Sequence, residues 1–437
     1  MHAFKGIVRT KRSLKLLVCI VLLANLVLLY VAVVVDPQST GLQFVGRGMV
    51  RFKIWSVAEF QRYRDIASDS LAFFPYLQTW IEYPQLASYL WMLLYIWVNF
   101  EFKEFILFHQ LIQFPMQVMI SLLIYRISRR FVSEVNAFFS AVSYSLCPLV
   151  IFVWLSRYDV MPAFLVVLSI FLILRERYSS SFFLLGVGTM MKWYPATLLP
   201  AYLVYLARNG KSLKSIVKYV SVFLTICLVP TLPFLFVRAP EWVINTLSPL
   251  AHLERGQNQE SLPGLIAFLL YRDFEREYRL STLLRVFQIV GIFSPLFLLP
   301  KRREELVGVC TIVVLSLLTF AKFYSPQWIA WVTPLLLVMM RNRGDWLKFW
   351  ALQLVVYLQY PVLYLYSWPH NWHWRLGGFW LVFNFGYWFL VATKFALFLV
   401  VMAVIIARLY RLGHPFTSQW RKFFAEGQYP LKKCQKK

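Results

Sequence analysis

Acidic side chains are scarce in this sequence. Of its 437 residues only 20 are Asp or Glu, against 45 Lys or Arg, and the formal net charge is +25. Charged residues make up 15% of the chain, whereas 59% of the residues are hydrophobic. A soluble domain carries about 25% charged residues. The composition therefore excludes an ordinary soluble protein and turns attention to the places where acids do occur.

Cysteine is also rare, and no repeat is present. The cysteines are scattered and lie mostly inside apolar runs, so they form no metal-binding or disulfide pattern. No fixed-period repeat stands out, which argues against a solenoid. The five cysteines are Cys19, Cys147, Cys227, Cys310 and Cys434.

Long apolar runs dominate what is there. Residues 16–35 read LLVCIVLLANLVLLYVAVVV, long enough to cross a bilayer as a helix. Backbone groups must be satisfied inside lipid, and the runs do not alternate as barrel strands do. The first run is longer than a signal-peptide core and has no small-residue cleavage site, so we read it as a permanent span. The sequence predicts an all-α, multi-pass transmembrane helical bundle.

The basic residues gather in short links between the apolar runs. Such links face the cytoplasm in membrane proteins. A consistent topology has about twelve crossings, with both termini inside. The positive charge then serves orientation and attraction to anionic membrane lipids rather than nucleic-acid binding. The links are KGIVRTKRSLK, RISRR, RERYSSS, RNGKSLK, KRREE, RNRGD and the C-terminal tail.

This topology requires two irregular regions. Residues 86–126 make one net crossing, with 86–100 as a half-membrane or re-entrant piece, and two short helices (182–194 and 196–207) meet at KWYP. The remaining spans are predicted at roughly 131–155, 159–175, 214–237, 279–299, 305–321, 326–341, 346–366 and 378–409.

The unusual polar motifs then all fall on the external face, which is the main argument for an external active site. They are the loop 36–85, SRYD (156–159), KWYP (192–195), HLERGQNQES (252–261), AKFYSPQW (321–328) and WPHNWHW (368–374).

The loop 36–85 holds three clustered acids, Asp65, Asp69 and Glu82. It is poor in Gly and Ser, so we expect it to be ordered and to carry amphipathic helices on the membrane surface. Asp65 and Asp69 are four residues apart and share a helix face. Pro84 suits a helix start directly after Glu82. Solvated surface acids remain the alternative reading.

Charged residues also lie at the ends of predicted spans. Arg157 and Asp159 stand between two spans, either as a local ion pair or with the arginine gripping a phosphate or sugar hydroxyl. Lys192 lies among apolar residues and is followed by Tyr194; a lysine in a membrane segment is a functional candidate unless it snorkels to the interface.

Two later loops add candidate residues, which are His252 and Arg255 in the first and Lys322 and Gln327 in the second. A solvated polar loop and a helix start with a snorkelling lysine are the alternative readings. In WPHNWHW no third metal ligand is evident beside the two histidines, so an interfacial aromatic belt explains it better.

Taken in order, these motifs resemble the GT-C superfamily of membrane glycosyltransferases. The resemblance is to the polyprenol-phosphate-dependent mannosyltransferases, glycosyltransferase family 87 and the first mannosyltransferase of GPI-anchor synthesis, over residues 14–340. The matching stretches are Tyr63-Arg64-Asp65, Glu82-Tyr83-Pro84, Arg157-Tyr158-Asp159, Lys192-Trp193-Tyr194-Pro195, His252 to Ser261, and Lys322 to Gln327.

The resemblance implies a catalytic module over residues 1–340, C-terminal spans over 341–410 and a basic cytoplasmic tail over 411–437. It implies a sugar donor carried on polyprenyl or dolichyl phosphate and a glycolipid or glycan acceptor. Asp65 is the expected base, and Asp69 and Glu82 are supporting or acceptor acids. Donor contacts are expected from Arg157, Asp159, Lys192, Tyr194, His252, Arg255, Lys322 and Gln327.

The chain departs from the family pattern at two positions. Gln85 replaces the second proline of a Y-P-P-L motif, and Asp65 is followed by Asp69 rather than by a second acid two residues on. The absence of an Asp-x-Asp motif at this place favours a reaction that needs no metal or other cofactor.

Two other functions stay open. A transporter or lipid flippase would also carry intramembrane charges, but it would show polar residues through the depth of several spans and inverted repeats. Another GT-C branch, such as a protein O-mannosyltransferase, would share these motifs. We expect a plasma-membrane location, or the ER membrane in a eukaryote.

Overall fold

The computed structural model describes residues 11–34, 58–72, 81–232, 256–273, 275–276, 279–363 and 378–411. Within these ranges the chain is helical and contains no strand, as the sequence predicts. The first half comprises α1 (Lys11–Val34), α2 (Ala58–Ala72), α3 (Gln85–Trp97), α4 (Phe102–Ser128), α5 (Glu134–Leu146), α6 (Pro148–Ser156), α7 (Val160–Ile173), α8 (Tyr178–Met191), η2 (Tyr194–Leu198) and α9 (Leu199–Arg208).

The second half begins with α10 (Leu213–Leu228), which continues into η3 (Val229–Thr231). It goes on with α14 (Leu262–Tyr271), α15 (Arg279–Phe293), α16 (Pro295–Leu298), α17 (Arg303–Phe320), η4 (Pro326–Trp328), α18 (Ile329–Val338), α19 (Arg343–Tyr357), η5 (Leu358–Leu363) and α22 (Gly378–Arg411).

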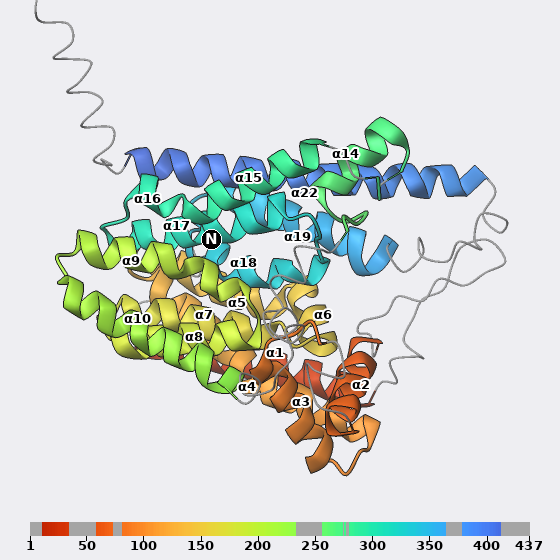
Figure 1. The fold of residues 1–437 in the computed structure, drawn as a ribbon, viewed down its shortest axis with the longest axis horizontal. Coiled ribbons are helices and arrows are strands. Elements are labelled where there is room, and N and C mark those ends of the chain that lie inside the picture. The colour runs from red at the N-terminus through yellow and green to blue at the C-terminus, as the bar shows by residue number, and fades with distance from the viewer. Residues whose placement is uncertain are drawn as a thin grey trace, which may run out of the picture.

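Most helices run side by side along the long axis of the molecule (Figure 1). The upper layer contains α14, α15 and α22, the middle contains α17, α18 and α19, and α1 to α4 lie at the bottom. α7, α17 and α18 are buried along most of their length and form the centre of one large apolar core. A smaller core joins α1, α4 and α5.

Local sequence signals explain where several helices begin. Ser133, Ser212 and Ser261 each accept a hydrogen bond from a backbone N–H in the first turn of α5, α10 and α14. Asn342 and Asp345 form a reciprocal capping box at the start of α19.

Within the described residues, four helical segments are long and apolar enough to cross a bilayer, and α5 with α6 adds a fifth if that bent pair is one span. Other predicted spans are shorter here; α7 has 14 residues and α18 has 10. At about 1.5 Å per residue these reach roughly 21 and 15 Å, short of a hydrocarbon core of about 30 Å. The twelve crossings are therefore not confirmed.

The irregular regions match the prediction more closely. The stretch 86–100, predicted as a half-membrane piece, contains α3, a helix of only 13 residues. The two short helices that meet at KWYP are α8 and α9, joined through η2. The span predicted at 131–155 is instead broken into α5 and α6 with a bend of 47°, because Pro148 cannot continue a helix and starts a new one.

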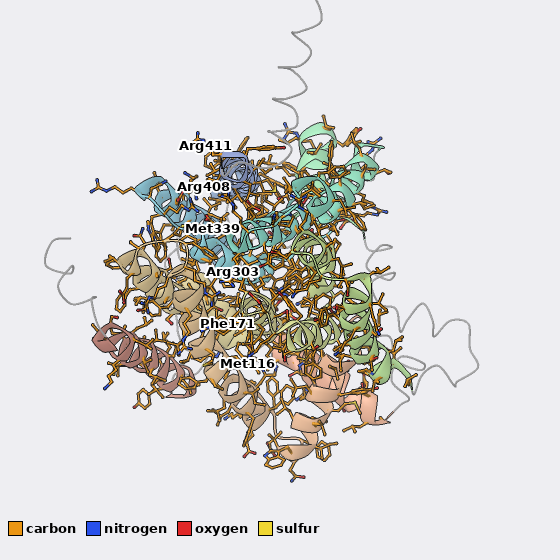
Figure 2. The ribbon with its side chains drawn as sticks, turned by 90° about the vertical axis from the view of Figure 1, so that its left-hand side faces the viewer. Met116, Phe171, Arg303, Met339, Arg408 and Arg411 are labelled. Atoms are coloured by element: carbon orange, nitrogen blue, oxygen red, sulfur yellow. The ribbon has the colours of Figure 1, made fainter. Side chains whose placement is uncertain are left out.

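The basic links between the described helices, which are RISRR, RERYSSS, RNGKSLK, KRREE and RNRGD, meet at one end of the bundle, here called the basic end. Figure 2 looks at this end and shows Arg303, Arg408 and Arg411 on it. Contacts between the links hold it together: Arg130 with the Leu174 carbonyl, Arg303 with Glu176, Asn209 with the Lys301 carbonyl, Asn136 with the Arg341 carbonyl, and Arg408 with Asp345. The links are thus neighbours in space, as the topology requires.

We predict that the basic end faces the cytoplasm and that α2, at the opposite end, faces the outside. In a chain with Cys19 and Cys434 replaced by serine, we expect Asp69→Cys, at an exposed position on α2, to react with an impermeant thiol reagent added to intact cells. Ala207→Cys, exposed at the basic end, should react only after permeabilisation. The reverse pattern would show that the orientation is inverted.

Candidate active site

Four breaks in the helical backbone bring polar residues together at the opposite end from the basic end. The breaks lie between α6 and α7, between α8 and η2, before η4, and inside η5. Arg157, Lys192, Ser325 and Tyr360 have extended backbone angles at these positions. Non-helical backbone in a membrane protein is tolerated where it is buried in protein.

Arg157 lies at the first break and is buried. Its Nε donates to Gln327 Oε1 at 3.3 Å, its Nη2 contacts the Tyr360 hydroxyl, and the same nitrogen lies 3.7 Å from Glu59 Oε1. The arginine therefore joins α2, η4 and η5. The sequence predicted Arg157 and Gln327 as site residues but gave no role to Glu59 or Tyr360.

Glutamine side chains of α4 support this break. Gln110 donates to the Leu155 carbonyl at 2.9 Å, and Gln113 donates to the Arg157 carbonyl at 2.8 Å. These carbonyls lose their helical partners where α6 ends, so the two amides replace the missing backbone hydrogen bonds.

Asp159 has 0% exposed surface and pairs with Lys192. Lys192 Nζ lies 2.7 Å from Asp159 Oδ1, and the Trp331 indole N–H donates to the same oxygen at 2.8 Å. The ammonium also lies 4.6 Å from the centre of the Tyr158 ring. Lys192 is therefore an ion-paired residue with 12% of its side chain exposed, rather than a lysine that snorkels to the interface.

Stacked aromatic rings surround this ion pair. The Tyr194 ring lies parallel to the Trp331 ring with centroids 4.2 Å apart. The Trp328 ring also stacks on Trp331, with centroids 4.8 Å apart. On the α2 side, Tyr63 stacks on Trp91 at 4.4 Å. The cluster therefore offers both aromatic ring faces and polar ring atoms beside the ion pair.

The predicted acids of α2 lie on its outer face. Asp65 is 55% exposed and pairs with Arg64 at 3.1 Å, and Asp69 is exposed on the next turn. At about 100° per residue, Asp65 points roughly 240° around the helix from Glu59. The structure therefore brings Glu59 to Arg157 and leaves Asp65 and Asp69 outside this cluster.

Glu82 is the third predicted acid and is buried. It forms an ion pair with Arg62, which also lies over the Tyr83 ring. Pro84 then precedes the first turn of α3, as predicted. The Glu82–Arg62 pair ties the start of α3 to the same face of α2 that carries Glu59.

The later loops meet one another beside Gln327. Asn258 donates to the Tyr324 carbonyl at 2.8 Å and accepts from the Tyr324 N–H at 3.1 Å. Ser325 donates to Gln327 Oε1 at 2.7 Å, and Lys322 lies half-buried in the same loop. The predicted donor residues His252 and Arg255, and the histidines at 370 and 373, lie outside the described residues.

A buried lysine on α22, Lys394, contacts both of these loops. Lys394 donates to the Glu260 carbonyl at 2.8 Å and lies 3.9 Å from the Tyr324 ring centre. The Glu260 carboxylate accepts hydrogen bonds from Tyr387 and Gln359, next to Tyr360. Burial raises the pKa of the Glu260 carboxyl to about 7. Lys394 was not among the predicted site residues, although a single lysine within a long apolar run is a visible signal in the sequence.

One comparison with known proteins covers part of this site. Residues 110–321 match the sequence model of glycosyltransferase family 87. The predicted resemblance is thereby confirmed over this range, and the match indicates a membrane glycosyltransferase. No curated protein matches the chain.

The matched range contains Arg157, Asp159, Lys192 and Tyr194. Glu59, Gln327, Tyr360 and Lys394 lie on either side of it, so the full cluster needs helices from outside the matched region. Among the described residues, no group of three or more His, Cys, Asp or Glu side chains could hold a metal.

Several buried polar atoms around the ion pairs have no hydrogen-bond partner among the described residues. Such atoms are rare in folded proteins, because an unpaired buried donor or acceptor costs about 1–3 kcal/mol. The hydroxyl groups of a sugar, or water, are suitable partners for them. The atoms are Glu59 Oε2, Tyr63 Oη, Trp91 Nε1, Asp159 Oδ2 and Tyr194 Oη.

Removing Lys192 from the ion pair should destabilise the protein. Lys192→Met leaves Asp159 buried without a cation, which typically costs about 3–5 kcal/mol. We expect a clear fall in the melting temperature of the detergent-solubilised protein. Lys192→Met combined with Asp159→Asn should recover most of the loss, because an asparagine oxygen still accepts from Trp331. An unchanged melting temperature in the single variant would contradict the ion pair.

Proposed function

We propose that this membrane glycosyltransferase transfers a sugar from a polyprenyl- or dolichyl-phosphate donor to a hydroxyl group of a glycolipid or lipid-linked glycan. The sugar that the family resemblance favours is mannose, and the reaction takes place on the external face. The observation that carries the proposal is the buried cluster in which Arg157 and Lys192, both at helix breaks in the family-matched region, lie beside carboxylates and stacked rings.

The cations suit the donor phosphate. An arginine guanidinium offers several N–H donors in a planar fork, and a lysine ammonium adds a compact charge. Arg157 shares its Nη2 between Glu59 and Tyr360, and Lys192 is paired with Asp159, so both cations are oriented before a donor arrives. Preorganised charge of this kind stabilises a leaving phosphate without further rearrangement.

The proposed reaction is a single displacement. The acceptor oxygen forms a bond to the anomeric carbon while the bond from that carbon to the phosphate oxygen breaks, and its electron pair leaves with the polyprenyl phosphate. The acceptor proton passes to a carboxylate. One displacement inverts the anomeric centre. Because the leaving group is a polyprenyl phosphate monoester whose charge is balanced by two cations, we expect the reaction to need no metal.

The geometry supports Glu59 as the proton acceptor better than Asp65. Glu59 is 23% exposed and faces Arg157, and its second oxygen is buried without a partner among the described residues. Asp65 was the base expected from sequence, and its carboxylate instead faces outward with Arg64. A base must lie within hydrogen-bond reach of the group that it deprotonates.

Glu59→Gln tests this assignment, and Asp65→Asn on the same helix is its matched control. General-base catalysis contributes about a hundredfold to ten-thousandfold, so Glu59→Gln should lower the turnover number at least a hundredfold while donor binding persists. Asp65→Asn should change turnover only slightly. If Asp65→Asn is inactive and Glu59→Gln turns over normally, Asp65 is the base.

The donor class can be tested on the purified protein. Mass spectrometry of co-purifying lipids should find a polyprenyl or dolichyl phosphate, and a polyprenyl-phosphate sugar should support transfer where a nucleotide sugar does not. Transfer from a nucleotide sugar in the absence of any polyprenyl phosphate would reject the proposed donor.

A further inference from the structure

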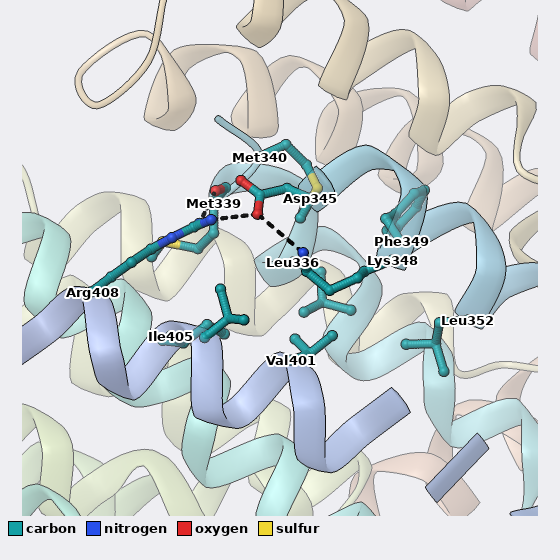
Figure 3. A pocket seen from close by; sticks show the side chains of 11 residues that line it. Leu336, Met339, Met340, Asp345, Lys348, Phe349, Leu352, Val401, Ile405 and Arg408 are labelled. Atoms are coloured by element: carbon teal, nitrogen blue, oxygen red, sulfur yellow. Dashed lines mark hydrogen bonds and ion pairs between the residues drawn. The ribbon is translucent and has the colours of Figure 1, made fainter. Parts of the chain in front are cut away.

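A second feature of the molecule lies at the basic end and has no part in the proposed reaction. A pocket opens there between the end of α18, the first half of α19 and the last turns of α22 (Figure 3). Asp345, Lys348 and Arg408 converge on one side of it. The other walls are apolar and include Leu336, Phe349, Leu352, Val401 and Ile405.

The pocket is well separated from the candidate active site. Asp345 lies at the start of α19, and Tyr360, which contacts Arg157, lies just beyond the end of that helix. A helix of 15 residues is about 22 Å long. The charges around the pocket therefore cannot contact a donor phosphate held at Arg157.

The pocket carries more positive than negative charge. Asp345 is buried, and its Oδ2 accepts from the backbone N–H groups of Arg341 and Asn342 at 3.0 and 3.3 Å. Its Oδ1 faces two cations, Arg408 in close contact and Lys348 at 4.0 Å. One carboxylate thus serves two cations.

Lys348 is the cation whose N–H groups are available to a ligand. Its side chain is 27% exposed, and 4.0 Å is too long for a hydrogen bond to Asp345. Its ammonium has three N–H donors. The ammonium is therefore placed to bind a further anion without breaking the Asp345–Arg408 pair.

The surface on both sides of the pocket is apolar. Leu347 and Leu354 are exposed on α19, and Leu399 and Val400 are exposed on α22. Exposed apolar side chains of this density on two neighbouring helices are stable against lipid chains rather than water. A ligand for this place needs a negatively charged head and apolar tails. Basic pockets between membrane helices bind anionic lipid head groups in this way.

We propose that the pocket is a binding site for an anionic phospholipid. The lipid phosphate lies against Lys348 and Arg408, and its acyl chains lie along the exposed faces of α19 and α22. This site does not depend on the proposed glycosyl transfer. A polyprenyl phosphate shares the same chemistry, but its phosphate is required at Arg157, at the other end of α19.

Native mass spectrometry tests the site on the intact protein, released from bilayers of phosphatidylcholine and phosphatidylglycerol mixed three to one. We expect one tightly retained phosphatidylglycerol. Lys348→Met should weaken its retention roughly fivefold, since a basic residue near anionic lipid contributes about 1 kcal/mol. Lys348→Arg should retain it. Lys214→Met, which removes an exposed lysine of α10 at the same end, is the matched control and should have no effect on this lipid.

Two outcomes would overturn the proposal. Equal losses in Lys348→Met and Lys214→Met would show only general attraction of anionic lipids to the basic end. Loss of a polyprenyl phosphate rather than phosphatidylglycerol from Lys348→Met would show that the occupant was wrongly identified. Both variants are checked for an unchanged melting temperature, so that a loss of lipid is not a loss of fold.

Discussion

The buried ion pair between Asp159 and Lys192 is the constraint on which the rest of this site depends. A carboxylate with no exposed surface is stable only with a close cation and with hydrogen bonds to its oxygens. Lys192 supplies the cation, and Lys192 and the Trp331 indole both donate to Asp159 Oδ1, so the breaks after α6, after α8 and before η4 must all meet at one point. The aromatic stacking and the placing of Arg157 follow from that meeting. Each break frees backbone groups, and the glutamines of α4 show how neighbouring side chains satisfy them.

The sequence was enough to predict the helical class and the resemblance to glycosyltransferase family 87. It was also enough to predict that the basic links lie at one end of the bundle and the polar site residues at the other. Apolar composition and basic links are properties of whole segments, so predictions made from them do not change when a helix end is misplaced by a few residues. Span number is harder to predict, because it depends on where each helix ends. At Pro148 one predicted span is divided into two short helices. The apolar pattern around this proline does not predict a 47° bend.

The candidate site was predictable residue by residue only where a charge interrupts an apolar run. Arg157, Asp159 and Lys192 were found in this way. Glu59 was missed because α2 carries charges on several sides, and which of them faces inward depends on packing against α3 and α4 rather than on local sequence. Tyr360 was missed for a related reason. A tyrosine near a membrane interface is common, and only the non-helical backbone at that position turns its hydroxyl toward Arg157.

The spacing of these contacts along the chain has a consequence for biogenesis. Asp159 and Lys192 are 33 residues apart, so their ion pair can form while most of the later helices are still being synthesised. Arg157 meets Gln327 across 170 residues and Tyr360 across 203. Contacts of such long range form late, since they require the intervening chain to be in place. A ribosome-bound chain ending before η4 would hold Lys192 but would lack Gln327 and Tyr360, two of the groups that orient Arg157, so it would remain inactive until the last helices are inserted.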